Sequence, residues 1–203
     1  MRQHMTDRGE ERKAAGWIDV RVWKKDNLKG PGQWLRPQVL PFNQEDEVRV
    51  EAELIRPAYL YVAWLDTAGK AVPIYPWDKH WNWPVAERPV DRLSLPASGK
   101  RWPISPGVPG METLLLLARE TPWPRDKDWR TLLDGLPPAA MQDPSSVVWF
   151  RNWAVVHDED DRAPNLFEER PGDPLLVTQE KLRERLQPYV VFSRAVSFAN
   201  AGR

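Results

Sequence analysis

The sequence predicts a mainly β protein: an antiparallel β-sandwich, immunoglobulin-like or jelly-roll-like, with a C-terminal helix and a final strand. Strand patterns outnumber helix patterns and do not alternate with them, which argues against a parallel βαβ sheet. Residues 47–55 alternate apolar and charged side chains, the period-two pattern of a strand with one buried face. Residues 113–120 form an apolar run of strand length, as expected for a central strand covered on both faces.

The N-terminal part predicts a tail followed by a first strand. Residues 1–15 are polar and charged, and we interpret them as a flexible tail or linker. Order is expected to begin at Trp17, because residues 17–23 alternate tryptophan and charged side chains with aliphatic ones. This pattern indicates a strand buried on one side and covered by tryptophan on the other. A loop rich in proline and glycine separates it from the strand at residues 47–55.

A β-hairpin is expected next. Residues 56–57 (Arg-Pro) interrupt the alternation, and residues 58–65 form a second strand rich in tyrosine, valine and tryptophan. Asp66 can accept a backbone amide hydrogen bond inside the following turn, and Gly69 supplies a positive φ without a steric penalty. The chain would then return as a strand over residues 71–75.

The C-terminal half carries the predicted helices. Leucines at helical spacing predict a short helix within residues 127–136, and β-branched and aromatic residues favour a strand over residues 147–156. Residues 174–186 form the clearest helix, with a leucine stripe and a proline, Pro188, after its end. A strand over residues 189–198 completes roughly six to eight strands and one or two helices.

The domain organisation follows from length and composition. A chain of 203 residues lies near the upper range of one ordinary domain and can bury a sizeable core. We interpret residues 16–203 as a single β-sandwich domain, with a C-terminal extension from about residue 137. The longest aliphatic run, residues 114–118, is far shorter than the roughly 20 residues of a membrane-spanning helix. Because the N-terminal segment also lacks an apolar signal region, we expect a cytoplasmic protein.

Composition excludes several functions. The 29 basic residues are matched by 29 acidic ones, which argues against bulk electrostatic binding of nucleic acid or an acidic membrane. No cysteine is present, so disulfides, thiolate zinc sites and cysteine nucleophiles are excluded. Only three histidines occur, and neither a Gly-x-Ser-x-Gly elbow nor a phosphate-binding P-loop pattern is found. We therefore expect no catalytic residues, no enzyme activity and no cofactor.

An acidic loop over residues 157–172 is the one candidate metal site. His157, Asp158, Asp160 and Asp161 offer the nitrogen and oxygen ligands that divalent cations use. The loop lacks the internal glycine and the ligand spacing of an EF-hand. A solvated acidic loop without metal is the favoured interpretation.

A tryptophan cluster at the exit of the hairpin is the candidate binding site. The residues that would contact a partner are Tyr75, Trp77, His80, Trp81 and Trp83. Aromatic platforms of this kind bind sugars by stacking, cations by the ring quadrupole, and extended peptides in grooves. The alternative is that the rings are buried and anchor loops that lack regular structure, and this is the favoured interpretation.

The same region resembles a known family. The resemblance rests on four motifs: residues 56–62 (Arg-Pro-Ala-Tyr-Leu-Tyr-Val), Asp66, Gly69 with Lys70, and residues 74–76 (Ile-Tyr-Pro). They resemble a bacterial β-rich domain of unknown function, typically C-terminal to serine/threonine protein kinases, caspase-like peptidases and other signalling modules. The resemblance covers roughly residues 17–136 and implies an accessory domain with no assigned catalytic residue.

Two details of that resemblance concern single positions. Ala58 stands where the family usually has glycine before the tyrosine. Residues 112–119, a glutamate followed by apolar residues, match the strand that the family usually has there. No functional residue of the family can be carried over.

The leading functional expectation is a non-catalytic interaction domain in a bacterial signalling system. It would bind a protein or extended peptide, for example a kinase or peptidase domain of the same system, and neither nucleic acid nor membrane. One alternative is carbohydrate or small-ligand binding through the tryptophan cluster. The other, least favoured, is a metal-dependent enzyme that uses the acidic loop.

Overall fold

The protein is mainly β, as predicted. The computed structural model describes residues 16–35, 39, 41–78, 80, 82–84, 86–97, 99–104, 108–128, 130–133, 135–136, 151–156 and 174–201. Within these residues nine strands form one sheet, and every pair of neighbouring strands is antiparallel. The predicted antiparallel, mainly β fold is thereby confirmed.

The strands and helices follow one another in a simple order along the chain. The strands are β1 (Gly16–Trp23), β2 (Gln33–Trp34), β3 (Glu47–Leu65), β4 (Ala71–Tyr75), β5 (Val90–Leu95), β6 (Trp102–Pro103), β7 (Gly110–Arg119), β8 (Arg151–Val156) and β9 (Phe192–Asn200). The helices are a short 3-10 turn, η1 (Lys25–Asn27), with α1 (Arg130–Leu133) and α2 (Pro174–Leu186). The sheet order is β2-β1-β3-β7-β9-β8, and β4, β5 and β6 also pair with β3.

Strand β3 belongs to both halves of the sheet. Its first part pairs with β1, β5 and β6, and its second part pairs with β4 and β7. The register against β5 shifts between Glu53 and Ala58, around Arg56 and Pro57. Pro57 has no N–H for a ladder hydrogen bond, so pairing lapses there and the strand changes neighbours.

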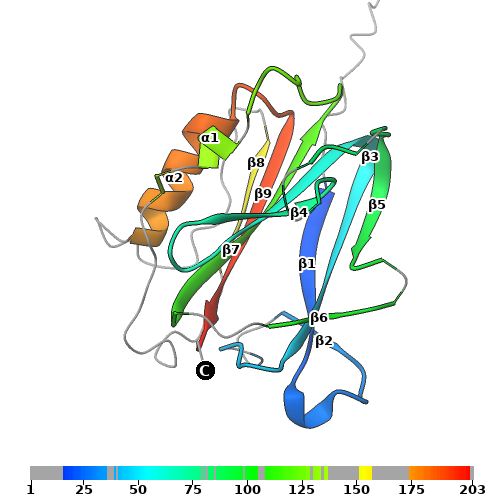
Figure 1. Ribbon diagram of the computed structural model, residues 1–203, viewed down its shortest axis with the longest axis vertical. Coiled ribbons are helices and arrows are strands. Elements are labelled where there is room, and N and C mark those ends of the chain that lie inside the picture. Colours follow the sequence, from blue (N-terminus) through cyan, green and yellow to red (C-terminus); the bar gives the residue numbers. More distant parts are fainter. Residues whose placement is uncertain are drawn as a thin grey trace, which may run out of the picture.

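The prediction of two strands separated at residues 56–57 was therefore wrong. One strand of 19 residues runs through the proline and bends from one half of the sheet to the other. The fold is a single sheet that curls over its own core, in place of the two separate sheets of a β-sandwich (Figure 1).

The main core lies inside the curl. Even-numbered residues of β3 on both sides of the bend contribute to it: Val48, Val50, Ala52, Leu54, Ala58, Leu60 and Val62. Arg56, next to Pro57, is the even-numbered residue that is exposed instead. The buried residues of β3 pack against inward-facing residues of β1, β7 and β9: Ile18, Val20, Val22, Leu114, Leu116, Ala118, Phe192, Val196 and Phe198. The side-chain period of two is thus kept through Pro57, and the alternation predicted for residues 47–55 is confirmed.

A second core lies on the outer face of the β7 half. Tyr61, Ala63 and Leu65 of β3 point into it, and Leu182 and Leu186 of α2 cover it. Figure 1 shows α1 and α2 lying together against this side of the sheet. Residues 114–118 of β7 are all apolar and contribute alternately to the main core and to the second core. Strand β7 therefore separates the two cores, which confirms its predicted role as a central strand.

The hairpin turn has the predicted chemistry. Asp66 Oδ1 accepts backbone hydrogen bonds from Ala68 and Lys70, at 3.0 Å and 2.8 Å. Gly69 has φ +77°, which only glycine adopts without strain. The turn joins β3 to β4 and places Asp66 beside the entrance of the pocket described below.

The C-terminal strands β8 and β9 belong to the sheet, and the two α-helices pack beside it (Figure 1). Strand β9 lies between β7 and β8, and α2 has the predicted bounds. Helix α1 is a single turn, shorter than the helix predicted within residues 127–136. The predicted strand over residues 147–156 is seen as β8, and residues 147–150, the acidic loop and the N-terminal tail lie outside the described residues.

Candidate functional site

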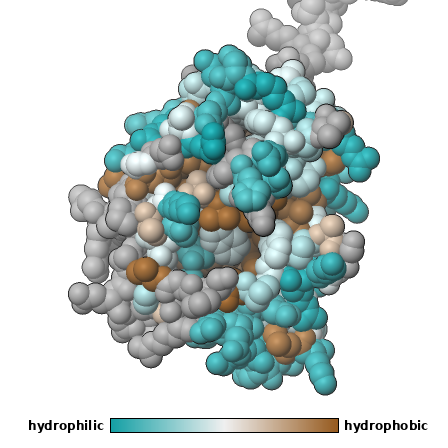
Figure 2. Space-filling model, in the orientation of Figure 1, coloured by the Kyte–Doolittle hydropathy of each residue, from teal (hydrophilic) through white to brown (hydrophobic). Residues whose placement is uncertain are grey.

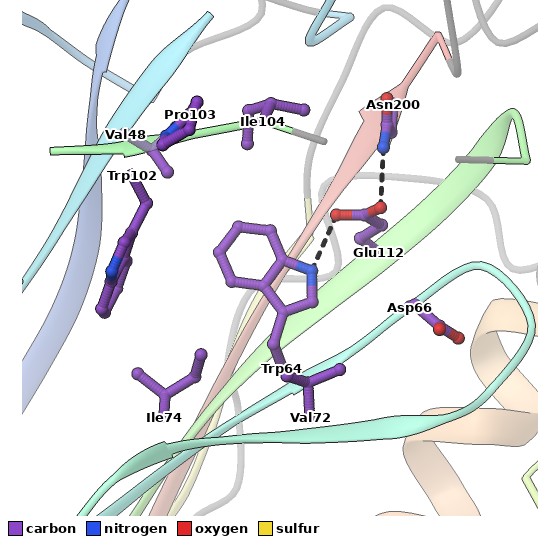
Figure 3. A pocket seen from close by; sticks show the side chains of 10 residues that line it. All are labelled: Val48, Trp64, Asp66, Val72, Ile74, Trp102, Pro103, Ile104, Glu112 and Asn200. Carbon is purple, nitrogen blue, oxygen red and sulfur yellow. Dashed lines mark hydrogen bonds between the residues drawn. The ribbon is translucent and has the colours of Figure 1, made fainter. Parts of the chain in front are cut away.

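A pocket opens where the two halves of the sheet face each other. It has a volume of about 470 Å³ and lies between β4 and β6, with the ends of β3, β7 and β9 behind it (Figure 3). The residues that line it are Val48, Trp64, Asp66, Val72, Ile74, Trp102, Pro103, Ile104, Glu112 and Asn200. In the same orientation as Figure 1, Figure 2 shows apolar residues gathered across the middle of the molecule, between more polar surfaces.

Glu112 is the buried carboxylate of this pocket. Its side chain lies at the inner face of β7, and the residue is 8% exposed. Oε2 accepts a hydrogen bond of 2.7 Å from the indole Nε1–H of Trp64 on β3. Oε1 accepts a hydrogen bond of 2.7 Å from the Nδ2 amide of Asn200 on β9. Donors from the two strands beside β7 therefore hold the carboxylate in one position (Figure 3).

Burial sets the electrostatics of this carboxylate. Loss of solvent raises the pKa of Glu112 above its ordinary value, and the hydrogen bonds from Asn200 and Trp64 lower it in part. The negative charge of Asp66, at the rim of the pocket, raises the same pKa further. The pocket thus joins two acidic side chains in a partly apolar setting.

The walls of the pocket are aromatic and aliphatic. Trp64 packs edge-on against Phe198, with ring centroids 5.2 Å apart and planes at 75°. Trp102 stands on the opposite side, and Val72 and Ile74 of β4 close the lower wall (Figure 3). Such a lining suits an apolar group that carries one polar or charged end.

The predicted tryptophan cluster lies elsewhere, on the second core. Trp77 is 5% exposed, and its ring centroid lies 5.1 Å from that of Trp83. Both rings contact Tyr61, at 5.3 Å and 6.1 Å between centroids. The Arg125 guanidinium lies 4.1 Å from the centre of the Trp83 ring and covers it. Trp77 and Trp83 therefore pack against the second core, in agreement with the interpretation that these rings anchor the loop.

The other members of the cluster are placed differently. Tyr75 is half-buried and lines a smaller pocket of about 270 Å³ with Tyr59 and Arg88. His80 is exposed, and Trp81 lies outside the described residues. The structure thus brings Trp77 and Trp83 together, whereas His80 is exposed to solvent. A partner surface at these residues stays a prediction.

A hydrogen-bond network ties this cluster to the sheet. The Tyr61 hydroxyl donates to Glu87 Oε2 at 2.7 Å and accepts from the backbone N–H of Trp123 at 2.7 Å. Glu87 also pairs with Arg125 at 2.5 Å. Burial and the Glu87 contact raise the pKa of Tyr61, so its hydroxyl keeps its proton and acts as a donor. The network explains why rings that follow the hairpin are held against the outer face.

The predicted metal site lies in a part of the chain that the structure does not describe. His157, Asp158, Asp160 and Asp161 lie outside the described residues. In the described part of the chain, no three histidine or acidic side chains gather in a way that could hold a metal ion. No helix there is long and apolar enough to cross a membrane.

The pocket residues were not identified as a site from the sequence. Trp64, Glu112 and Asn200 come from three strands, separated by 48 and 88 positions along the chain. The one local signal is Glu112 itself, a charged residue shortly before the apolar run of residues 114–118, where charges are rare. No protein-family model matches the chain, and no curated protein or solved structure matches it.

Proposed function

We propose that this chain is a non-catalytic interaction domain that binds an extended segment of a protein partner, with the pocket between β4 and β6 receiving one of its side chains. The observation that carries the proposal is the Glu112 carboxylate, held by Trp64 and Asn200 inside an apolar pocket. A polar group fixed before binding supplies orientation without an ordering cost.

The size and position of the pocket support this proposal. Its volume of about 470 Å³ falls within the range of roughly 300–1,000 Å³ typical of ligand sites. Strand β4, which forms one wall, pairs with β3 on one side and has no second neighbour among the described strands. An extended segment could therefore align with β4 through backbone hydrogen bonds while a side chain enters the pocket.

The biological setting of the proposal comes from the sequence resemblance. A bacterial signalling system, a kinase or peptidase domain as partner, and a cytoplasmic location are parts of the same proposal. They rest on the motifs between residues 56 and 76, which resemble those of the accessory family.

Binding of a carbohydrate or another small ligand is the second candidate. The indole rings of Trp64 and Trp102 in one pocket favour it, because aromatic faces bind sugar rings by stacking. Trp77 is buried in the second core, so the pocket is the better place for such a ligand than the tryptophan cluster.

A selection from a phage-displayed library of random peptides tests the leading proposal. We expect binding sequences whose affinity falls about tenfold or more when Trp102→Ala removes one wall of the pocket. The matched control is Trp17→Ala, a tryptophan that is 36% exposed on the outer face of β1. Circular dichroism checks that both variants fold.

Two outcomes would contradict the proposal. The first is that no sequence is enriched over a blank surface. The second is that enriched peptides bind Trp102→Ala and the wild type equally well. Titration of a glycan panel, followed by the indole N–H signals of Trp64 and Trp102 in NMR spectra, separates the small-ligand candidate from the peptide.

A further inference from the structure

We infer that the pocket recognises a cationic side chain, lysine or arginine, on the bound peptide, with Glu112 as its partner. This inference rests on the proposed function and names the chemistry of the segment that is bound. It follows from a comparison of the buried carboxylates, from the acceptor sites left on Glu112, and from the shape and lining of the pocket.

Buried carboxylates elsewhere in the described structure have cationic partners. The Asp46 side chain is fully buried and pairs with Lys24 Nζ at 2.6 Å. The Glu87 side chain is 5% exposed and pairs with Arg125 at 2.5 Å. Glu112 is nearly as buried, yet in the described part of the chain its two contacts are with the neutral donors Trp64 and Asn200. A cationic ligand would supply the counter-charge that the other two already have.

The hydrogen bonds to Glu112 leave acceptor capacity for a ligand. An ionised carboxylate has about four lone-pair sites. Each oxygen of Glu112 uses one of these sites, for Trp64 and for Asn200. Figure 3 shows the carboxylate between these two donors, with the Trp64 ring lying between it and Trp102. A charged N–H donor in the pocket could use the remaining sites, and hydrogen bonds that involve an ionised donor and acceptor are the stronger ones.

The net charge of the lining also favours a cation. Among the described residues that line the pocket, two are acidic and none is basic. Asp66 Oδ1 is used by the hairpin turn, so Asp66 contributes through its charge at the rim and Glu112 makes the direct contact. The charge of Asp66 already raises the pKa of Glu112, and a bound cation would reverse that effect.

The walls match the rest of a basic side chain. Lysine and arginine carry a charged head on an aliphatic stem, and the stem can lie along apolar surface. Val48, Val72 and Ile74 line the same pocket as Glu112 and provide that surface. The rings of Trp64 and Trp102 add cation–π attraction for a head group within about 6 Å of their faces. An uncharged apolar side chain would use the walls and leave the carboxylate unpaired.

The test uses the peptides obtained from the selection. We expect lysine or arginine at one common position, and replacement of that residue by norleucine or citrulline should weaken binding to the wild type about tenfold or more. This change is made on the peptide, so it does not depend on the stability of a protein variant.

The protein side of the test is a double-mutant cycle. Glu112→Gln should weaken the basic peptide about tenfold or more and leave the norleucine peptide nearly unchanged. The control is Glu53→Gln, which removes a carboxylate that is 41% exposed and pairs with Arg92 outside the core. Melting curves verify that each variant is folded at the temperature of the titration.

The outcomes separate this inference from the proposed function. If no peptide binds at the pocket, the proposed function is wrong. If peptides bind and need Trp102, but show no basic position or no dependence on Glu112, the cation inference alone is overturned. If hexylammonium binds as tightly as the basic peptide, the site is one for free amines, and the peptide as the source of the cation is wrong.

Discussion

The indole Nε1–H of Trp64 donates a hydrogen bond of 2.7 Å to Oε2 of Glu112 and thereby joins β3 to β7 inside the curled sheet. Asn200 completes the arrangement from β9, at 2.7 Å from Oε1. The carboxylate is thus held by neutral groups from both neighbouring strands, at the end of the main core. Stability and binding are coupled at this point, because the same side chain is part of the core and of the pocket.

Removal of the indole donor should destabilise the fold. Trp64→Phe keeps an aromatic ring beside Phe198 but leaves one oxygen of Glu112 without its donor. We expect a loss of about 1–3 kcal/mol in the free energy of unfolding, measured by urea denaturation. The loss should be smaller in a Glu112→Gln background, where no charge is left unpaired. An equal loss in both backgrounds would show that ring volume, and not the hydrogen bond, accounts for the effect.

The stability of the protein should depend on pH through Glu112. Burial raises the pKa of this carboxyl in the folded state, so the folded protein holds the proton more tightly than the unfolded chain. The resulting stabilisation is fully present below the unfolded pKa, about 4.3, and is lost as pH rises through the folded pKa. The wild type should therefore lose stability relative to Glu112→Gln between about pH 4 and neutral pH. Urea midpoints for both proteins across this range measure the difference, and a constant difference would contradict the prediction.

The sequence predicts the strands better than it predicts how they are joined. Alternation over residues 47–55 and the apolar run over residues 113–120 are local signals, and both elements form as expected. The continuity of β3 through Pro57 is not local, because it depends on which strands lie beside each half. A proline interrupts pairing with one neighbouring strand. The strand still continues where a different strand pairs with the residues that follow, as β7 does after Pro57.

The pocket was not predicted for the same reason. Trp64, Glu112 and Asn200 meet only after β7 has paired with β3 on one side and β9 on the other. The dense run of aromatic residues after the hairpin predicted a binding site there instead, but Trp77 and Trp83 pack on the second core. A single glutamate at the edge of an apolar strand was a weaker signal in the sequence, yet it marks the more open site.

Truncation of Trp83 should lower stability more than truncation of His80. Trp83 contacts Trp77 and Tyr61 and is covered by Arg125, whereas His80 is exposed. We expect Trp83→Ala to cost about 2–3 kcal/mol, less than a fully buried tryptophan, and His80→Ala to change stability by at most about 0.5 kcal/mol. Thermal unfolding followed by circular dichroism measures both. A stable Trp83→Ala variant that fails to capture selected peptides would move the binding site to the tryptophan cluster.

The buried pair between Asp46 and Lys24 should be one of the larger single contributions to the fold. Asp46 Oδ2 lies 2.6 Å from Lys24 Nζ, and the two carboxylate oxygens also accept backbone hydrogen bonds from Lys25 and Asn43, at 3.0 Å and 2.8 Å. Asp46→Ala would leave the backbone N–H groups of Lys25 and Asn43 without this acceptor just before β3. Lys24 Nζ would keep its contacts with the carbonyl oxygens of Val39 and Pro41, at 3.4 Å and 3.1 Å. We expect a loss of about 3 kcal/mol, because the mutation removes a fully buried carboxylate that pairs with Lys24 and accepts two backbone hydrogen bonds.

An exposed ion pair on β3 provides the comparison for Asp46, which lies just before that strand. Glu53 pairs with Arg92 at 3.0 Å, but the two side chains are 41% and 76% exposed. Solvent screens this pair, so Glu53→Ala should cost at most about 1 kcal/mol, and less at high salt. Urea unfolding of both variants at low and high salt tests the contrast. The Asp46→Ala loss should persist in salt, because its carboxylate is shielded from solvent and its hydrogen bonds to backbone N–H groups do not depend on a free counter-ion. Equal losses for the two variants would mean that burial does not distinguish the pairs, and the same reasoning would then fail for Glu112.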